Sequence, residues 1–297
     1  MSYTVGCRLN DIPHINKYLK NLNSQIPLGD ELEVNFESKE QRKERIFQKF
    51  VPGVSHVYYF FDFILKRVFP KWSPTKKIYF RVTKGRNRVL STPEVLGRIV
   101  SCGFKILNYE RIDLVTVVRA IKVCEPAFNL SPTYGALIKL SRVGLNGAVF
   151  NVYKFRTMHP FSEYIQEYIY KKNQLKEGGK IASDFRITHY GAWMRRVWID
   201  ELPMLYNLLR GELKLVGVRP LSPHFFQLYP EDIQKLRTKT RPGLIPPFYA
   251  DLPKNFNEVV QSEHLYLIRY LHSPLKTDWI YFCKAIYNIL FKRARSN

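Results

Sequence analysis

Residues 199–220 read IDELPMLYNLLRGELKLVGVRP, with two carboxylates, Asp200 and Glu201, directly before an apolar helical stretch. Pro203 fits the first turn of such a helix, because the N–H that proline lacks has no partner there. Asp200 then lies at or near the N-cap, a position that aspartate favours. Free amides and the helix dipole make this position suitable for anions. The stretch therefore predicts a helix start that carries two acids and also tolerates phosphate.

The composition indicates a folded, strongly basic protein. The chain has 297 residues, 45% of them hydrophobic, which suits one large domain or two smaller ones with a real core. Its formal net charge of +22 favours anionic partners, namely nucleic acid, acidic lipid or phosphorylated small molecules. No helix-turn-helix, zinc-finger or RNP-type signature is present, so we expect no specific nucleic-acid binding.

The cysteines and the hydropathy indicate a cytoplasmic location. Four single cysteines form no CxxC pair and no Cys/His ligand cluster, which argues against zinc and fits a reducing compartment. The N-terminus has no apolar core of the signal-peptide type. No stretch reaches the roughly 18 apolar residues of a membrane-spanning helix. We expect a protein that can touch a membrane surface without crossing it.

The N-terminal region, residues 1–125, is predicted to be a small α/β region whose role the sequence does not disclose. Residues 92–102 look helical, with Thr92 as N-cap and Gly103 as terminator. Residues 104–123 form two β-rich runs that we expect to pair as strands. Two prolines and a glycine in CEPAFNLSPTYG (124–135) indicate a linker, which places the domain boundary there.

The second region, residues 126–297, is predicted to begin with a β-hairpin. The β-patterned runs ALIKLSRV and AVFNVYKF flank GLNG (144–147), and an Asn-Gly turn between such runs is a strong hairpin signal. Turns and short helices alternate from there on. The predicted fold class is therefore α+β, with a helix-rich domain after the small α/β region.

Two aromatic segments allow two interpretations each. VYYFFDFILKRVFPKW (57–72) reads as a helix buried in its own domain, or as an interfacial helix with aromatics in the headgroup zone and cations on anionic lipid. TDWIYFCKAIYNILFKRARSN (277–297) reads as a docked C-terminal helix with a solvated basic tail, or as a second contact with lipid.

Five blocks in order resemble the bacterial sugar transferases, the monotopic polyprenyl-phosphate phosphoglycosyl transferases. The blocks are SPTYGALIKLSRVGLNG (131–147), YKFRTM (153–158), DFRITHYGAWMRR (184–196), IDELPMLYNLLRGELKLVGVRP (199–220) and RPG (241–243). The resemblance implies that a nucleotide sugar, usually a UDP-sugar, donates its sugar-1-phosphate to a polyprenyl phosphate. It further implies an aspartate-bound phosphosugar intermediate, assistance by Mg²⁺, and a role in starting capsule, exopolysaccharide or O-antigen synthesis at the inner face of the cytoplasmic membrane.

The resemblance also implies roles for residues of this chain. Asp200 and Glu201 are the predicted catalytic residues and Mg²⁺ ligands, which suits an ion that prefers carboxylates together with substrate phosphates. The predicted phosphate-binding cations are Lys154, Arg156, Arg186, Arg195, Arg219 and Arg241. Simpler roles remain open: Asp200 as a helix cap, Glu201 as a first-turn charge, and Arg156 and Arg186 as partners of carboxylates such as Asp184.

One departure from the family leaves a second function open. Members carry a long apolar segment that enters the membrane as a re-entrant helix before the SP-containing stretch. Here RIDLVTVVRAIKVCEPAFN (111–129) fills that place and looks like a strand plus linker. The alternative function is a non-catalytic relative that acts as partner or regulator in a polysaccharide assembly system.

Overall fold

A computed structural model describes residues 1–126, 135–173, 175–176, 180–181 and 184–292. The chain divides into two compact units. Unit 1 comprises Met1–Gly135 and Met158–Lys172, and unit 2 comprises Ala136–Thr157 and Asn173–Asn297. The expected division into 1–125 and 126–297 differs from these bounds mainly in residues 158–172, which leave unit 2 and pack with unit 1.

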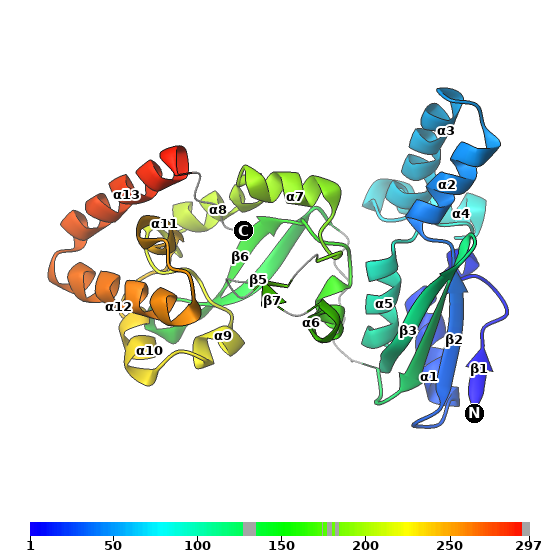
Figure 1. Cartoon of the computed structure of the whole chain (residues 1–297), viewed down its shortest axis with the longest axis horizontal. Helices are drawn as coiled ribbons and strands as arrows, with labels where there is room; N and C mark the ends of the chain where they lie inside the picture. Colours follow the sequence, from blue (N-terminus) through cyan, green and yellow to red (C-terminus); the bar gives the residue numbers. More distant parts are fainter. Residues whose placement is uncertain (127–134, 174, 177–179, 182–183, 293–297) are drawn as a thin grey trace. The chain divides into compact units, whose positions relative to one another are not determined.

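Unit 1 is built on a four-stranded mixed sheet with the order β1-β2-β4-β3 (Figure 1). The strands are β1 (Ser2–Thr4), β2 (Glu31–Phe36), β3 (Phe104–Ile112) and β4 (Val115–Lys122). β1 runs parallel to β2, whereas β4 pairs antiparallel with both β2 and β3. The predicted pairing of the two runs within 104–123 is therefore confirmed. Burial alternates along β4, so that one face of the sheet lies on the core.

Two helices, α1 (Ile15–Gln25) and α5 (Thr92–Ser101), complete the core of unit 1. They contact each other, and α5 also contacts β3. The N-cap of α5 is Ser91, so the expected cap at Thr92 is wrong by one residue. Gly103 ends the helix as predicted, with a left-handed φ of 91° that favours glycine.

Residues 158–172 belong to unit 1 because of one close approach. A Cβ on Gly97 of α5 would lie 2.0 Å from the carbonyl oxygen of Phe161, so only glycine lets the two backbones meet. The segment forms the 3₁₀ turn η4 (Ser162–Ile165) and starts α6 (Gln166–Asn173). Phe161, Ile165 and Ile169 are buried, so the segment contributes apolar side chains to this unit.

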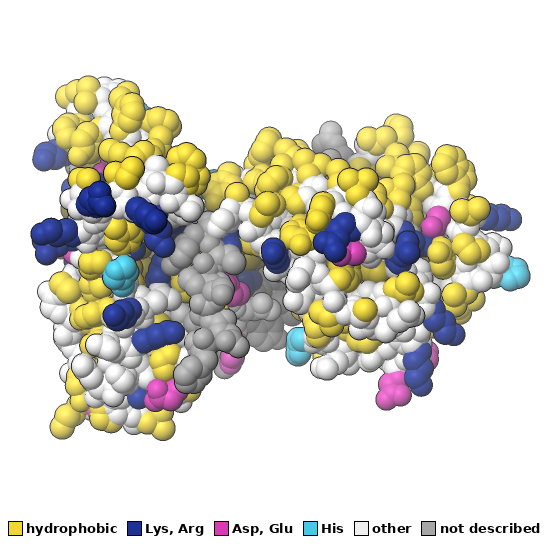
Figure 2. Space-filling model, turned by 180° about the vertical axis from the view of Figure 1, so that it is seen from behind, with side chains coloured by type: hydrophobic (Ala, Val, Ile, Leu, Met, Phe, Trp, Pro, Cys, Tyr) yellow, Lys and Arg dark blue, Asp and Glu magenta, His cyan; other side chains and the backbone are white. Residues whose placement is uncertain are grey.

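At one end of the unit 1 sheet, four helical segments carry an exposed apolar surface (Figures 1 and 2). They are α2 (Lys39–Lys49), α3 (Val54–Phe63), the π-helical turn η2 (Ile64–Val68) and α4 (Ser73–Thr83). Arg42 of α2 holds α3 through two hydrogen bonds of 2.6 and 2.7 Å to Asp62. The interpretation of 57–72 as a helix buried in its own domain is wrong, because Phe60 and Phe61 are 59% and 57% exposed.

Unit 2 opens with the predicted hairpin. β5 (Leu137–Val143) and β6 (Val149–Phe155) pair antiparallel along their whole length. The turn between them is η3 (Leu145–Gly147), in which Asn146 and Gly147 take φ of 55° and 74°. Asparagine and glycine tolerate this left-handed backbone better than other residues, which is why the Asn-Gly pair predicted the hairpin correctly.

The rest of unit 2 is mostly helical, as predicted. Its helices are α7 (His189–Arg196), α8 (Met204–Leu209), α9 (Pro223–Gln227), α10 (Glu231–Arg237), α11 (Phe248–Asp251), α12 (Phe256–His272) and α13 (Pro274–Phe291). Short strands pair in parallel, β9 (Lys214–Val216) with β10 (Gly243–Ile245), and antiparallel, β7 (Leu175–Lys176) with β8 (Lys180–Ile181). The core gathers Val216, Val218, Tyr229, Ile233, Val260, Tyr266, Leu267 and Tyr281.

The C-terminal helix α13 confirms the docked-helix interpretation of 277–297, whereas contact with lipid stays a prediction. Tyr281, Ala285 and Asn288 form a buried stripe, and Asn288 donates hydrogen bonds to the carbonyls of Tyr249 and Ala250. Trp279, 67% exposed, lies outside that stripe. The helix therefore docks on unit 2 and still exposes aromatic surface; its basic end, 293–297, lies outside the described residues.

Within the described ranges, every helix is too short or too polar to cross a bilayer. Residues 111–122, in the place of the family's re-entrant segment, form the end of β3 and all of β4, which confirms the expected strand. Residues 127–129 of the expected linker lie outside the described part of the chain.

Candidate active site

The Asp-Glu pair lies in a tight turn between two helices of unit 2. α7 ends at Arg196, and Trp198 then takes a left-handed φ of 56° that redirects the chain. Ile199–Glu201 form the 3₁₀ turn η5, and α8 starts at Met204 with Pro203 as its N-cap. Asp200 therefore lies ahead of the helix rather than at its N-cap, and α8 has only six residues. The charge environment of the pair comes mainly from neighbouring side chains.

Lys154 of β6 faces this turn. Its Nζ donates a hydrogen bond to Oε1 of Glu201 at 2.5 Å, and both side chains are largely buried. Burial raises the pKa of Asp200 above its ordinary value; Lys154 opposes this shift, and Glu201 adds to it. Asp200 is thus a buried, relatively basic carboxylate beside a fixed cation, which favours nucleophilic attack on an electrophile such as phosphorus.

Arg195, in the last turn of α7, is fixed by Thr157, which follows the end of β6 by two residues. Its Nε donates to Oγ1 of Thr157 at 2.9 Å. The N-cap of α7, Thr188, also bonds to the Thr157 carbonyl through its amide at 2.9 Å and its hydroxyl at 3.0 Å. A Cβ on Gly191 would lie 2.0 Å from that carbonyl oxygen, so glycine is needed for this approach. Burial lowers the pKa of Arg195, and Asp200 opposes this shift, which places the guanidinium within electrostatic reach of the carboxylate.

Arg186 is held by a carboxylate of its own loop. Its guanidinium donates to both oxygens of Asp184 at 2.7–3.1 Å, and the pair is buried. The structure therefore contains the loop-fixing contact that the sequence left open. Its charge still acts on the site, because Arg186 contributes to lowering the pKa of Arg195.

Arg219, three residues after the end of β9, is exposed, and its charge reaches the site. It contributes to lowering the pKa of both Lys154 and Arg195, after the larger effect of burial on each. Its carbonyl accepts a hydrogen bond from Arg237. Its guanidinium makes no hydrogen bond or ion pair with the described residues. Arg219 is therefore a cation beside the dyad that is available to a ligand.

The two remaining predicted cations are placed less directly. Arg156 directly follows β6, two residues after Lys154, and its amide donates to the Ala136 carbonyl at 2.6 Å. Arg241 lies beside Gly211, past the end of α8 that is remote from the dyad. Within the described ranges, Arg241 shares no hydrogen bond or ion pair with the dyad or its cations.

Asn207 is a positioning residue that the sequence analysis missed. It is completely buried on α8, and its Nδ2 donates to the Asn151 carbonyl at 2.7 Å while its Oδ1 accepts from the Tyr153 amide at 3.1 Å. Its Nδ2 also bonds to Glu212 at 2.7 Å. These bonds fix α8 to β6. They thereby also hold the turn that carries Glu201 next to Lys154. A polar residue inside the apolar run PMLYNLL is the signal that could have indicated it.

The dyad offers part of a magnesium site. In the described part of the chain, no three or more His, Cys, Asp or Glu side chains form a group that could hold a metal. The two adjacent carboxylates nevertheless match what Mg²⁺ takes from proteins when substrate phosphates supply further oxygens.

Comparison with known proteins identifies the family. Residues 109–292, more than half of the chain, match the family described as Bacterial sugar transferase. The chain belongs to this family, and the five blocks that suggested the resemblance lie inside the matched range.

Named relatives agree with this assignment. The exopolysaccharide production protein ExoY of Rhizobium meliloti is 35% identical over 54% of this chain and 76% of its own length. The galactosyl transferase CpsE of Streptococcus agalactiae is 35% identical over 44% of this chain, and the undecaprenyl-phosphate glucose phosphotransferase of Komagataeibacter xylinus is 37% identical over 58%. The chain spans only 30% and 32% of the lengths of these last two proteins.

Proposed function

We propose that the chain transfers a sugar-1-phosphate from a nucleotide sugar, most simply a UDP-sugar, to a polyprenyl phosphate. The reaction would initiate exopolysaccharide, capsule or lipopolysaccharide synthesis. The observation that carries the proposal is the buried Asp200 among Lys154, Glu201, Arg195 and Arg219. The named relatives support it, since one of them is an undecaprenyl-phosphate glucose phosphotransferase.

In the proposed first step, a carboxylate oxygen of Asp200 attacks the phosphorus that bears the sugar. The new bond joins this oxygen to phosphorus, and the bond from phosphorus to the bridging oxygen breaks, so that UMP leaves with the electron pair. In the second step, a phosphate oxygen of the polyprenyl phosphate attacks the same phosphorus. The bond to Asp200 breaks, which restores the carboxylate and yields the lipid diphosphate sugar.

The surrounding cations suit a reaction that depends on positioning and charge neutralisation. Lys154 and Arg195 are fixed by protein contacts and would neutralise charge on the transferred phosphoryl group. Arg219 is free to grip a phosphate of the donor or the acceptor with two N–H groups. Mg²⁺ held by Asp200 and Glu201 would further neutralise the diphosphate.

The proposal includes peripheral contact with an anionic membrane at the inner face of the cytoplasmic membrane, where the lipid acceptor would be met. α3 and α4 support it, because α3 exposes Phe60 and Phe61, and α4 exposes Ile78 and its N-cap residue Trp72. Residues 51–88 contain nine Lys and Arg but one acid, Asp62, which is buried against Arg42. Aromatics flanked by cations suit the interface of an anionic bilayer.

Intact-protein mass spectrometry tests the central step. After incubation with a panel of UDP-sugars and Mg²⁺, the protein should gain the mass of one sugar phosphate and release UMP. Asp200→Asn should abolish the gain, whereas Asp232→Asn, an exposed acid on α10, should retain it. No adduct and no UMP across the panel would instead favour the non-catalytic partner role. An adduct on Asp200→Asn would exclude Asp200 as the nucleophile.

A further inference from the structure

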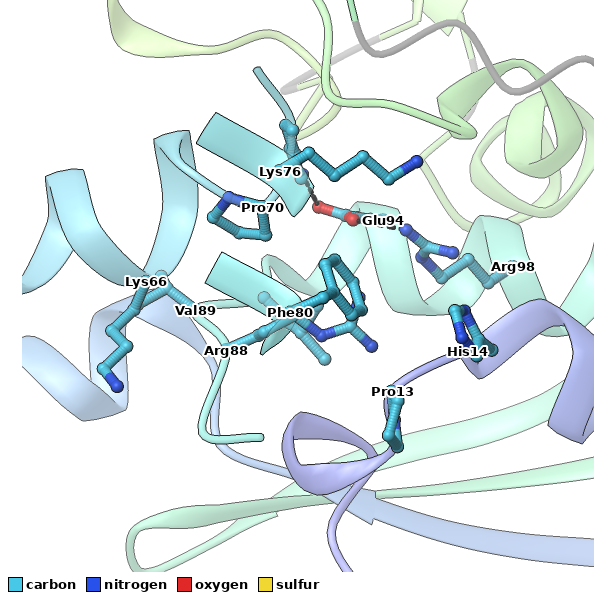
Figure 3. A pocket seen from close by; sticks show the side chains of 12 residues that line it. Pro13, His14, Lys66, Pro70, Lys76, Phe80, Arg88, Val89, Glu94 and Arg98 are labelled. Carbon is cyan, nitrogen blue, oxygen red and sulfur yellow. Dashed lines mark hydrogen bonds and ion pairs between the residues drawn. The ribbon is translucent and has the colours of Figure 1, made fainter. Parts of the chain in front are cut away.

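Arg142 of β5 is half-buried, and within the described residues no carboxylate bonds to it. Its guanidinium makes one described hydrogen bond, to the Ser141 carbonyl at 2.8 Å. Arg98 provides a contrast, because it lines a cavity of unit 1 and donates to the buried carboxylate of Glu94 at 2.9 Å (Figure 3). A guanidinium that is partly withdrawn from water without an acid beside it is suited to meet an anion from outside the chain.

Arg142 lies on the same face of the first hairpin of unit 2 as Lys154. In the register of β5 and β6, Arg142 is paired with Phe150. Paired residues point to the same side of a sheet, and so do residues four positions apart on one strand. Lys154 is four positions after Phe150, which corresponds to about 13 Å along the strand. Arg142 and Lys154 therefore mark the two ends of one row of side chains.

The charge of Arg219 reaches both ends of this row. Burial lowers the pKa of Arg142, and the charge of Arg219 lowers it further. Burial also lowers the pKa of Lys154, where Arg219 again adds to the shift and Glu201 opposes it. Lys154 has Glu201 as its partner, but in the described part of the chain neither arginine has an acid bonded to it. The two arginines thus form a pair of like charges that an anion would stabilise.

The backbone around Arg219 is held by other groups, so that its guanidinium remains available. The Val143 amide, next to Arg142 in the sequence, donates to the Leu221 carbonyl at 2.9 Å. The buried Arg237 of α10 donates to the Arg219 carbonyl. These two bonds hold the segment of Arg219 beside the end of β5 that carries Arg142.

The chemistry of the proposed transfer requires a second position for a phosphate. In a displacement at phosphorus, the attacking and leaving oxygens lie roughly in line on opposite sides. When Asp200 attacks, the nucleotide phosphate therefore leaves from the side away from Asp200. When the lipid phosphate later displaces Asp200, it has to attack from that same side. One place next to the transferred phosphorus consequently receives both phosphates, one after the other.

We propose that Arg142 and Arg219 form this second phosphate position, an inference that rests on the proposed transfer reaction. Lys154 and Arg195 neutralise the transferred phosphoryl group beside Asp200. Arg142 and Arg219 bind the leaving nucleotide phosphate in the first step and the incoming polyprenyl phosphate in the second. Both of these groups are phosphomonoesters, whose three terminal oxygens can accept several N–H groups from two guanidinium forks at once.

Calorimetric titration with UMP tests the arginine pair without any turnover. Arg142→Gln should weaken UMP binding at least tenfold, and Arg142→Lys, which keeps the charge but loses the fork, should recover part of the affinity. Lys139→Gln, three residues earlier on β5 and on the opposite face, is the matched control and should bind UMP like the parent chain. Urea unfolding should show Arg142→Gln to be at least as stable as the parent chain, because a repulsion between like charges is removed.

Mass spectrometry of the Asp200 adduct separates the two steps. With a UDP-sugar, Arg142→Gln should form the adduct at least tenfold more slowly than the parent chain. Polyprenyl phosphate should also discharge a preformed adduct at least tenfold more slowly in this variant. Slow formation with parental discharge would assign the pair to the donor alone, and slow discharge with parental formation would assign it to the acceptor alone. Either result would overturn the shared position.

The UMP titration also keeps this proposal separate from the transfer reaction. A parent chain that binds UMP through Arg142 but forms no adduct would refute the transfer and retain the pair as a phosphate-binding site. Equal UMP affinity of Arg142→Gln and the parent chain overturns the pair, as does a parent chain that binds no UMP. A marked loss of stability in Arg142→Gln would show that the guanidinium serves the fold and would overturn it as well.

Discussion

The Lys154 ammonium donates a hydrogen bond to the Glu201 carboxylate at 2.5 Å, which joins the first hairpin of unit 2 to the turn that carries the dyad. This contact joins two residues that belong to different sequence blocks and lie more than forty positions apart. Because Lys154 is bonded to Glu201, Asp200 has no direct lysine partner in the described contacts. Asp200 is therefore better suited than Glu201 to act as the nucleophile.

Replacing Lys154 tests this arrangement. Lys154→Met should lower kcat for sugar-phosphate transfer by about 10²-fold or more, the effect of removing one charge-stabilising group from an active site. Release of UMP measures it. Lys139→Met, an exposed lysine opposite Tyr153 on the same hairpin, is the matched control and should keep its activity. Equal activity of both variants would remove Lys154 from the site.

Replacing Asn207 should destabilise unit 2. Asn207→Ala leaves the Tyr153 amide and the Asn151 carbonyl without their partner, at a cost of about 2–4 kcal/mol in the free energy of unfolding. Urea unfolding measures this loss. Asn151→Ala is the control, because Asn151 contributes its backbone carbonyl and its side chain is exposed. If the two variants were equally stable, Asn207 would not fix α8 to β6.

The exposed surface of α3 should determine binding to anionic vesicles. Phe60→Ser combined with Phe61→Ser should weaken partitioning into the vesicles by about 10²-fold. Each phenylalanine side chain that moves from water into the bilayer contributes about 1.5–3 kcal/mol. Co-sedimentation with vesicles measures the change. Leu28→Ser, at a position 71% exposed between α1 and β2, is the control and should bind like the parent chain. Unchanged partitioning of the phenylalanine variant would exclude this surface as the membrane contact.

His159 should make the stability of the protein depend on pH. The buried imidazole, whose Nδ1 contacts the Ser91 hydroxyl at 3.1 Å, has a pKa of about 3 in the folded chain and an ordinary value of 6.5. Below pH 6.5 His159 binds a proton in the unfolded chain but stays neutral in the folded chain. The free energy of unfolding should therefore fall by up to about 1.4 kcal/mol for each pH unit between 6.5 and 4.5.

The variant His159→Asn keeps an amide near the position of Nδ1 and removes the titration. Its unfolding free energy, followed by urea denaturation at several pH values, should fall less steeply than that of the parent chain. His224→Asn, at an exposed position on α9, should leave the slope unchanged. Parallel curves for His159→Asn and the parent chain would show that the imidazole is not buried in its neutral form.

Local chemistry accounts for what the sequence predicted well. The Asn146-Gly147 turn requires left-handed backbone, so the hairpin followed from two residues. Lys154, Glu201, Arg195 and Arg219 were proposed from motifs, and the structure brings them together. The roles of these residues in catalysis, phosphate binding and metal binding stay predictions. The predicted role of Arg241 in phosphate binding also stays a prediction.

What the sequence did not predict depends on contacts between distant segments. The apolar pattern of 57–72 defines an apolar face, but it does not say whether protein or another medium covers that face. Asn207 and Gly191 gain their roles from β6 and Thr157, which lie far away in the chain.

The course of the chain after Thr157 sets a limit on how the protein can be divided for experiments. One packed group contains Phe161, Ile165 and the Arg98 guanidinium, which lies 4.4 Å over the Phe161 ring. In the sequence, the linker separates Arg98 of α5 from Phe161 and Ile165. A truncated protein that starts at residue 126 would keep Phe161 and Ile165 and lose the helix that covers them. Such a fragment would expose apolar surface a few residues from Thr157, which anchors Arg195. Poor solubility or low turnover of the fragment would therefore report the truncation itself and not the proposed transfer chemistry.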